Sequence, residues 1–369
     1  IDKDFVSEFV TKNVEFFKKN KISFFEMTVA MAFDYFAKSN VDIAVIETGL
    51  GGRLDSTNIL NPLVSLITNI GLDHKEFLGN NLIDIANEKA GIIKKDIPIV
   101  ISEFQKETYP IFENKAHTIE TDIFLADDQK KFKTDLSGDF QNKNINGVVK
   151  VISLLKDFSI SNKDIENGLL NIKKNTGLMG RVQILNDLPK VICDVGHNLE
   201  AFQVIKDHIN SLKFDNLKLV LGFVKGKDFK KIIDILPKNA NYFFCTPKIE
   251  RGLSLEILAS YGSVNKLKYS LHDTVLDAYN SALSSSSDND LIFIGGSNFT
   301  VSEILWFWYK FWDISDMKNF ILFLTLIFSF SCSSDEFEKD GYDKDGNSYD
   351  GPIETITHNG VERKYIIYT

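Results

Sequence analysis

The stretch VIETGLGGRLDSTN, residues 45–58, ends an apolar run in the carboxylate of Glu47 and continues with three glycines. A carboxylate at the carboxyl end of a parallel strand faces the crevice where doubly wound sheets bind ligands, and glycines let the backbone approach a charged group closely. Magnesium prefers oxygen ligands together with water and phosphate. Glu47 is therefore a candidate magnesium ligand, and the structural alternative is an ion pair between Glu47 and Arg53.

Two further residues could act beside Glu47. His74, in TNIGLDHKEFLG, lies just beyond the next apolar run, and the ends of adjacent strands would bring its imidazole to the same point. Lys89, in IANEKAGIIK, lies among small and apolar neighbours, where burial would lower the pKa of its amine and leave it reactive. A histidine after a strand and a lysine on a helix are also common as structural residues, so both alternatives stay open.

Hydrophobic periodicity predicts the elements that position these residues. Short apolar runs alternate with amphipathic ones, a pattern typical of parallel strands joined by helical crossovers. Residues 1–40 have a helical pattern, and we expect strands at 41–47, 63–70 and 97–102 and helices at 81–94, 143–158 and 162–173. Beyond a linker at 175–181, five strand and helix units follow, with strands near KVICDV, KLVLGF, NYFFCT, VNKLKY and LIFIGG. They predict a second doubly wound sheet.

Composition excludes several classes of protein. With 44% hydrophobic and 25% charged residues, the 369-residue chain has the balance of a soluble globular protein with two domains. Its net charge is −9, but residues 333–369 hold nine acidic and four basic residues, and no basic stripe suggests a nucleic-acid partner. Cys193, Cys245 and Cys332 are far apart, which argues against a zinc site or a disulfide framework. We expect a cytoplasmic body without membrane contact.

The segment MKNFILFLTLIFSFSCSSDE, residues 317–336, differs from the rest of the chain. A methionine, a lysine, an apolar run too short to span a bilayer and then Cys332 resemble a bacterial lipoprotein signal peptide. Such a signal works at an N-terminus, so we expect that the chain joins two reading frames. A membrane anchor and a buried apolar helix are the alternatives. The acidic residues that follow are expected to be solvated and disordered.

Eight segments carry a resemblance to a known family. In chain order they are ETGLGGRLDSTN, TNIGLDHKEFLG, IANEKAGIIK, LSGDFQNKNI, GRVQIL, DVGHN, LGFVKGKD and IGGSNFTVSEIL. Together they resemble the folylpolyglutamate synthase/dihydrofolate synthase family of the Mur ligase superfamily. The resemblance implies an α/β fold with a Mur-ligase-like central ATP-binding domain at 1–176 and a Rossmann-like glutamate-ligase domain at 177–312. Residues 313–369 would then be an unrelated tail.

The resemblance also implies roles for three residues of the first domain. Glu47 and His74 match the family's magnesium ligands. Lys89 matches a lysine whose carbamylation converts the amine into a carboxylate-like ligand for a second magnesium ion. Two Mg²⁺ ions, with ATP as co-substrate, are therefore expected.

Five further residues match nucleotide contacts of the family. Asn144 matches an asparagine that contacts ATP, and Arg181 and Asp194 match residues with which the C-terminal domain closes over the nucleotide. His197 and Asn198 lie in the same DVGHN loop as Asp194. Structural alternatives are a helix cap for Asn144 and for Asp194, and a salt bridge in the linker for Arg181.

The implied activity is ATP-dependent ligation of L-glutamate to dihydropteroate or tetrahydrofolate through an acyl phosphate, by a monomer. The chain departs from the family because it contains no GxxxxGK[ST] phosphate loop, and GFVKGKD at 222–228 is one residue too short. It is thus expected to start after that loop and after a loop that binds the pterin, to bind ATP weakly and to turn over negligibly. The alternatives are another Mur-type amide ligase of cell-wall synthesis and an inactive ligase fragment with a lipoprotein tail.

Overall fold

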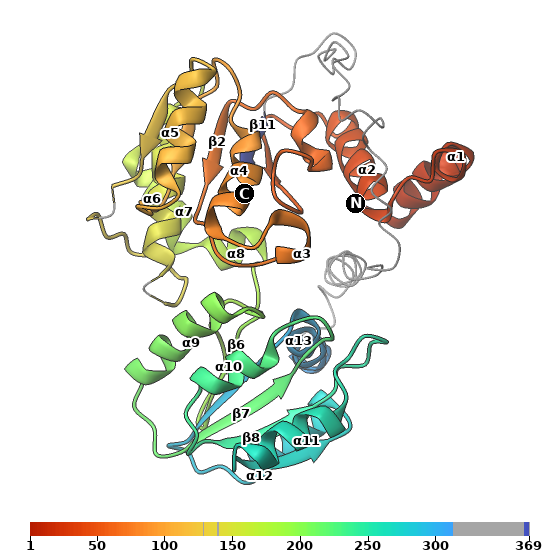
Figure 1. The fold of residues 1–369 in the computed structure, drawn as a ribbon, viewed down its shortest axis with the longest axis vertical. Helices are drawn as coiled ribbons and strands as arrows, with labels where there is room; N and C mark the ends of the chain where they lie inside the picture. Colours follow the sequence, from red (N-terminus) through yellow and green to blue (C-terminus); the bar gives the residue numbers. More distant parts are fainter. Residues whose placement is uncertain (128, 139, 313–364, 369) are drawn as a thin grey trace. The chain divides into compact units, whose positions relative to one another are not determined.

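The computed structural model describes residues 1–127, 129–138, 140–312 and 365–368, which form two compact units (Figure 1). Unit 1 contains residues 1–129 and 146–159 together with a C-terminal strand. Unit 2 contains residues 130–145 and the described residues from 160 to 312. Each unit has its own sheet with helices, so the α/β class expected from the sequence is confirmed. The predicted domain boundary at residue 176 stays a prediction.

The sheet of unit 1 has five parallel strands in the order β1-β11-β2-β3-β4. They are Ala44–Glu47 (β1), Val64–Ile67 (β2), Ile99–Ile101 (β3), Ile123–Leu125 (β4) and Tyr365–Tyr368 (β11). The first three strands confirm the expected ones, although each is shorter. Neither β4 nor β11 was expected.

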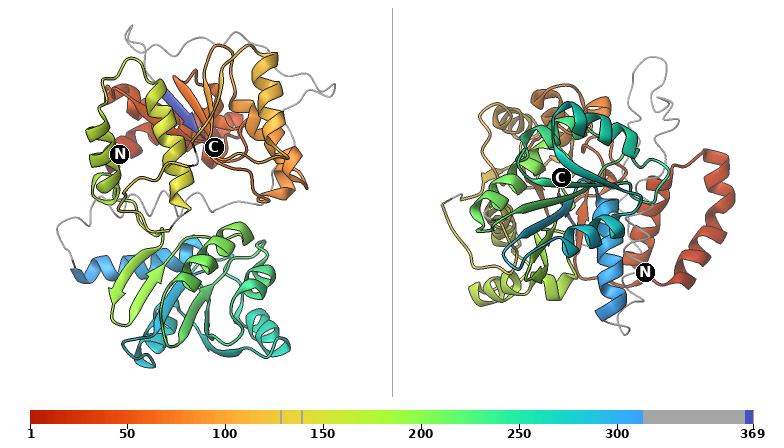
Figure 2. Two further views of the ribbon diagram at one scale, coloured as in Figure 1. Left: turned by 90° about the vertical axis from the view of Figure 1, so that its left-hand side faces the viewer. Right: turned by 90° about the horizontal axis from the view of Figure 1, so that it is seen from below.

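The position of β11 corrects two expectations. β1 and β2 are not neighbours in the sheet, because β11 pairs with both of them, and it runs alongside them as the blue arrow in Figure 2. The C-terminal tail was expected to be disordered, which is wrong for residues 365–368, since four consecutive apolar and aromatic residues with high strand propensity form a strand there. The signal-like segment at 317–336 lies outside the described residues.

Side-chain caps start several helices of unit 1. Asp2 accepts a hydrogen bond from the Phe5 N–H at the start of α1, and Ser23 with Glu26 forms a capping box at the start of α2. The helices are Lys3–Asn20 (α1), Phe24–Lys38 (α2), Ser56–Ile59 (η1), Lys75–Leu78 (α3), Leu82–Lys89 (α4), Ala90–Ile92 (η2) and Tyr109–Thr118 (α5). Helix α6, Gln141–Leu154, begins in the residues of unit 2 and ends in those of unit 1.

Strand alternation divides the core of unit 1 between the two faces of the sheet. Ile67, Ile99 and Ile101 pack with apolar residues of α4 and α5 on one face. Val64, Leu66 and Val100 pack with Val151 and Leu155, in and just after α6, on the other. The side chains of a parallel sheet are buried on both faces in this way when helices cover them.

The sheet of unit 2 has six strands in the order β5-β6-β10-β7-β8-β9. They are Gln183–Asp187 (β5), Lys190–Cys193 (β6), Leu217–Gly222 (β7), Asn241–Cys245 (β8), Lys268–His272 (β9) and Leu291–Gly295 (β10). The five expected strands are confirmed as β6 to β10, all parallel. β5 is an additional antiparallel edge strand.

Helices cover both faces of this second sheet, as in a doubly wound fold. The helices of unit 2 are Asn162–Leu170 (α7), Ile172–Thr176 (α8), Leu199–Ser211 (α9), Phe229–Ile235 (α10), Leu255–Val264 (α11), Val275–Ser284 (α12) and Asn298–Trp312 (α13). One face packs Leu219, Leu221 and Phe293 against apolar residues of α9, α10 and α11. Helix α12 contacts β7 and β8, and α13 contacts β10.

Two further features concern the cysteines and the helices. Cys193 and Cys245 are buried free thiols, and burial raises the pKa of each well above its usual value. Within the part of the chain that the structure describes, every helix is too short or too polar to cross a bilayer.

Candidate functional site

Strand β1 delivers a carboxylate to the carboxyl edge of the unit 1 sheet. Ala44 and Ile46 are buried with Leu60 against apolar residues of α2, whereas Val45 and Glu47 are exposed. Glu47 is the last residue of the strand, as predicted. Its carboxylate therefore lies where ligands bind to parallel sheets.

Asp55 holds the glycine-rich loop that follows β1. Its Oδ2 accepts hydrogen bonds from the backbone N–H groups of Gly49 and Leu50, each at 2.8 Å. Its Oδ1 accepts from the N–H of Thr57 at 2.9 Å and from the hydroxyl of that residue. Asp55 as a whole is 7% exposed. The buried carboxylate of Asp55 thus holds the conformation of the loop by accepting four hydrogen bonds.

The glycines of this loop allow close packing against the end of α4. A Cβ on Gly52 would lie 2.9 Å from the carbonyl oxygens of Glu88 and Lys89, and a Cβ on Gly91 would lie 2.2 Å from Cα of Arg53. The Arg53 N–H donates to the Glu88 carbonyl at 2.8 Å. From the sequence, the glycines were expected to let a charged ligand approach the backbone closely, and contacts within the protein in any case require glycine at positions 52 and 91.

Lys89 lies at the carboxyl end of α4, beside this loop. Burial lowers the pKa of its amine, while the negative charges of Glu47, Asp55 and Asp73 act in the opposite direction. The side chain is half-buried. The expected direction of the pKa shift of Lys89 is confirmed. The amine of Lys89 and the three carboxylates that act on it lie near one another.

His74 lies beyond β2, at the N-terminal end of α3. Its backbone is in the left-handed region, with φ of 49°, which is uncommon for a residue other than glycine and often marks a functional site. Its N–H donates to Oδ1 of Asp73 at 2.8 Å, and its Nε2 lies 4.0 Å from Oδ2 of the same residue. The imidazole is exposed, and β2, the strand before it, is separated from β1 by β11.

The side chains around Lys89 limit which kind of metal ion could bind here. Among the described residues, no group of three or more His, Cys, Asp or Glu side chains is arranged to hold a metal ion by itself. Mg²⁺ usually takes one or two protein carboxylates and completes its shell with phosphate oxygens and water. The carboxylates of Glu47 and Asp73, both near the Lys89 amine, are ligands of that chemical type.

Asn144 lies in the first turn of α6 and is exposed. Its Nδ2 donates to Oε1 of Gln141 at 3.2 Å. It is therefore a residue inside the helix, which corrects the alternative that it caps the helix. The glutamine was not singled out from the sequence, although it stands in the same FQNKN segment.

Asp194 follows β6 and is buried. Its Oδ1 accepts from the N–H of Gly196 at 2.7 Å and its Oδ2 from the N–H of Val182 at 2.8 Å. Burial raises the pKa of this carboxyl, and the two backbone hydrogen bonds and the positive charge of Arg181 oppose that shift. Arg181 itself is exposed. Asp194 thus ties together two loops and does not cap a helix.

The cap at this position is Asn198. Its side chain accepts from the Ala201 N–H at 2.9 Å at the start of α9. Nδ1 of His197 lies 3.2 Å from the carbonyl oxygen of Val195. Both residues are half-buried beside Asp194. The predicted residues therefore form two groups, with Glu47, His74 and Lys89 in unit 1 and the other five in unit 2.

Two acidic residues of the site were missed in the sequence. Asp55 could have been found as an aspartate followed by Ser56 and Thr57, because such side chains often bond to the backbone two residues on. Asp73 directly precedes His74, but the sequence gives no signal that it lies near Lys89.

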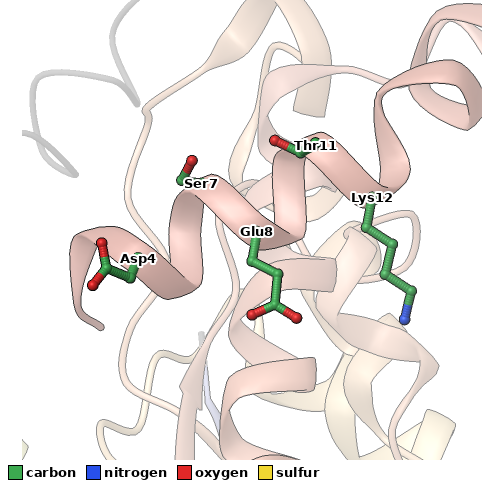
Figure 3. Close-up of a pocket in the computed structure, with 5 residues that line it drawn as sticks. All are labelled: Asp4, Ser7, Glu8, Thr11 and Lys12. Atoms are coloured by element: carbon green, nitrogen blue, oxygen red, sulfur yellow. The ribbon is translucent and has the colours of Figure 1, made fainter.

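A surface hollow elsewhere in unit 1 contributes nothing to this site. Figure 3 shows five polar residues of α1 that line it, namely Asp4, Ser7, Glu8, Thr11 and Lys12. Glu8 and Lys12 point to one side of the helix and Ser7 and Thr11 to the other. Side chains that diverge from a single helix do not form a binding site.

Two family models and several curated proteins match this chain. The family model "Mur ligase middle domain" matches residues 5–188, and "Mur ligase, glutamate ligase domain" matches residues 180–298. A probable dihydrofolate synthetase of Schizosaccharomyces pombe is 31% identical over 315 residues, covering 78% of this chain and 70% of that protein. A dihydrofolate synthase/folylpolyglutamate synthase of Buchnera aphidicola is 29% identical over 330 residues, covering 82% and 75%.

Solved structures show the same fold. Mycobacterium tuberculosis folylpolyglutamate synthase complexed with ADP matches with a TM-score of 0.73 at 21% identity, covering 82% of this chain and 78% of that chain. Escherichia coli FolC in complex with DHPP and ADP matches with a TM-score of 0.66 at 23% identity, covering 78% and 71%.

Proposed function

Because this chain belongs to the dihydrofolate synthase/folylpolyglutamate synthase family of Mur ligases, we propose that its reaction is ATP-dependent ligation of L-glutamate to a folate-type acceptor. The acceptor is dihydropteroate, tetrahydrofolate or both. The observation that supports a charge-handling site most directly is Lys89, half-buried at a sheet edge beside the charges of Glu47, Asp55 and Asp73.

The proposed reaction has two steps. A carboxylate oxygen of the acceptor attacks the γ-phosphorus of ATP, and the bond to the β,γ-bridging oxygen breaks to give an acyl phosphate and ADP. The neutral amine of glutamate then attacks the acyl carbon, phosphate leaves, and the amine loses its proton as the amide forms. Holding the reactants in place and excluding water would prevent hydrolysis of the acyl phosphate.

The chain's own residues would take separate roles. Glu47 and His74 would hold Mg²⁺, which when bound neutralises phosphate charge. Lys89, if carbamylated, would add an oxygen ligand for a second ion, and Asp55 would keep the loop and α4 in register. This carbamylation requires the neutral amine, which the lowered pKa of Lys89 favours.

The residues of unit 2 would bind the nucleotide. Asn144 and Arg181 are exposed and so accessible to a ligand. Asp194 would act through the loop that it holds, which carries His197 and Asn198. The 369 residues contain no phosphate loop, and preorganised phosphate donors typically contribute several kcal/mol of transition-state stabilisation. We therefore propose weak ATP binding and negligible turnover for this sequence alone.

A nucleotide titration tests the role of Glu47. Binding of a fluorescent ATP analogue is measured with and without Mg²⁺ for the native chain, for Glu47→Gln and for the control Glu8→Gln on the exposed face of α1. Mg²⁺ should strengthen binding in the native chain and the control and have little effect in Glu47→Gln. An equal Mg²⁺ effect in all three proteins would contradict the proposal.

A second experiment tests the acceptor. Calorimetric titrations compare dihydropteroate, tetrahydrofolate and a UDP-linked peptide precursor, each with Mg-ATP present. Binding of a folate-type acceptor alone is expected. Preference for the UDP-linked peptide would favour a ligase of cell-wall synthesis. Glutamate ligation by this chain above the Glu47→Gln background would contradict the proposed negligible turnover.

A further inference from the structure

Two residues with left-handed backbone flank Arg181 in unit 2. Gly180 has φ of 70°, which glycine adopts without strain, and Val182 has φ of 42°. For a β-branched residue this region is a genuine outlier, because its Cβ crowds the following carbonyl oxygen. Among the described residues, seven other than glycine have positive φ, and Val182 is the one that is β-branched and buried, whereas the other six are exposed.

Three hydrogen bonds hold the backbone of this segment. The Val182 N–H donates to Oδ2 of Asp194 at 2.8 Å. The Gly180 N–H donates to Oε1 of Gln183 at 2.8 Å, and the Gly180 carbonyl oxygen accepts from the Val195 N–H at 2.9 Å. A strained residue persists only where the surrounding structure over-determines its conformation, and such residues concentrate at ligand-binding and catalytic sites.

The side chain of Val182 anchors the segment in the core of unit 2. Val182 is 2% exposed and belongs to the same cluster of buried residues as Ile192 and Phe202. Packing explains why an apolar side chain stands here, but a core position can also be filled from an unstrained backbone. The strained turn lies directly between this buried anchor and the exposed Arg181.

We propose that Val182 is a positioning residue for nucleotide binding, because its buried side chain and left-handed backbone hold the exposed Arg181 in one place. This inference rests on the proposed function, in which Arg181 contacts the nucleotide. A guanidinium binds phosphate oxygens through several donors in a fixed plane, so its binding depends on orientation. A segment that is fixed before the ligand arrives loses less conformational entropy on binding than a flexible one.

A matched pair of variants at residue 182 separates positioning from packing. Val182→Ala and Val182→Gly both remove the two γ-methyl groups and both keep the N–H that bonds to Asp194. Alanine stays strained at this φ and glycine does not, so Val182→Gly should have the higher urea midpoint when unfolding is followed by tryptophan fluorescence.

Nucleotide affinity should change in the opposite direction. Glycine leaves the segment more flexible, so Val182→Gly should bind a fluorescent ATP analogue with Mg²⁺ at least about threefold more weakly than Val182→Ala. If Val182 only filled the core, the more stable variant would bind the nucleotide at least as tightly. Equal or tighter binding by Val182→Gly would therefore overturn the proposal.

The same pair in an Arg181→Ala background tests whether Val182 acts through Arg181. The difference in affinity between the two variants should disappear there, because the residue that they position is gone. A difference that persists would overturn the proposal. Unchanged affinity in Arg181→Ala alone would remove the nucleotide contact of the proposed function, and this inference with it. Lowered affinity in Arg181→Ala, with equal affinities in the Val182 pair, would overturn this inference alone.

Gln183 provides a second measurement that leaves the core unchanged, and it decides the question if the Val182 variants do not fold. Gln183→Ala removes the acceptor of the Gly180 N–H, whereas Gln183→Glu keeps a side-chain oxygen there. Gln183→Ala should bind the ATP analogue at least about threefold more weakly than the native chain, and Gln183→Glu should retain most of the native affinity. Native affinity in Gln183→Ala would contradict the proposal.

Discussion

The two sheets of this protein are assembled from the chain in different ways. Unit 2 takes all six strands from one continuous stretch, residues 183–295, whereas unit 1 takes four strands from residues 44–125 and a fifth from residues 365–368. In unit 2 the chain runs across the sheet to the edge strand β9 and then returns to place β10 between β6 and β7. In unit 1 the strand from the end of the chain is inserted between the first two.

The units also place their charges differently. Unit 2 buries an ion pair, with Lys218 Nζ 3.6 Å from Oδ2 of Asp290 and side-chain exposures of 5% and 3%. In unit 1 the pair beside the candidate site, Arg53 and Glu88, is 47% and 25% exposed, and the groups around Lys89 lie at the sheet edge. Unit 2 thus uses charge inside its fold, while unit 1 presents charge at the carboxyl edge of its sheet.

The largest expected effect is that of removing Asp290 from the buried pair. Asp290→Ala should destabilise unit 2 by about 3–5 kcal/mol, because the Lys218 ammonium would stay buried without its carboxylate. The measurement is urea unfolding followed by tryptophan fluorescence, since Trp306, Trp308 and Trp312 are all in α13 of unit 2. Glu88→Ala in unit 1 is the matched control.

That control should cost only about 0–1 kcal/mol, because solvent weakens an exposed pair. Its effect is read from hydrogen exchange of unit 1 peptides, since every tryptophan of the chain lies in unit 2. Equal losses of stability in the two variants would remove the distinction between buried and exposed charge.

The next effect concerns the polar support of the candidate site. Asp55→Ala should destabilise unit 1 by about 3 kcal/mol, because buried backbone N–H groups of the loop would lose a charged acceptor. The control Asp42→Ala changes an exposed residue just before β1 and should change stability by less than about 0.5 kcal/mol. Hydrogen exchange of unit 1 peptides measures both. A small effect for Asp55→Ala would show that the loop does not depend on its carboxylate.

The different ways in which the two sheets are assembled from the chain limit how much of each could be predicted from the sequence. Strands β6 to β10 follow one another as apolar runs, each with its helix, so local periodicity was sufficient to find them. The edge strand β5, QILND, is half polar and gave no such signal. Strand β11 could not be predicted because its place depends on a gap that opens more than 300 residues earlier in the chain, between β1 and β2.

The candidate site was predictable to a similar extent. Glu47 and Lys89 lie where the motifs indicated, at a strand end and in a helix. The roles of the glycines could not be predicted from the sequence. Gly52 and Gly91 pack against α4 and the loop, and this contact joins segments about 40 residues apart. The spacing of residues within a motif predicts which groups lie at the same edge of the sheet. It does not predict which atoms fill the space between those groups.

A smaller, pH-dependent effect is expected from Lys94 in unit 1. Its Nζ donates to the carbonyl oxygens of Asn58 and Leu60, and burial lowers its pKa to about 8. The unfolded chain, with a lysine pKa of 10.5, binds more protons than the folded one between these values. The stability of unit 1 should therefore rise as the pH rises from about 8 toward 10.5.

Lys94→Met should remove this rise, and Lys95→Met, which changes an exposed lysine next to it, should keep it. The measurement is the urea concentration at which unit 1 peptides lose protection from hydrogen exchange, determined at several pH values. An identical pH profile for native chain and Lys94→Met would show that another group titrates.

The smallest effect separates steric from conformational reasons for a glycine, and it does so within unit 2. Gly168, in helix α7, and Gly177, at the end of α8, both have open space where a Cβ would be, but Gly177 has φ of 67°. Gly168→Ala should stabilise unit 2 by about 0.5–1 kcal/mol, because alanine loses less entropy in a helix. Gly177→Ala should destabilise it by about 1 kcal/mol, because alanine is strained in the left-handed region. Urea unfolding by tryptophan fluorescence reads both, and a shift of the same sign in the two variants would show that contacts, not backbone conformation, decide these positions as they do at Gly91 in unit 1.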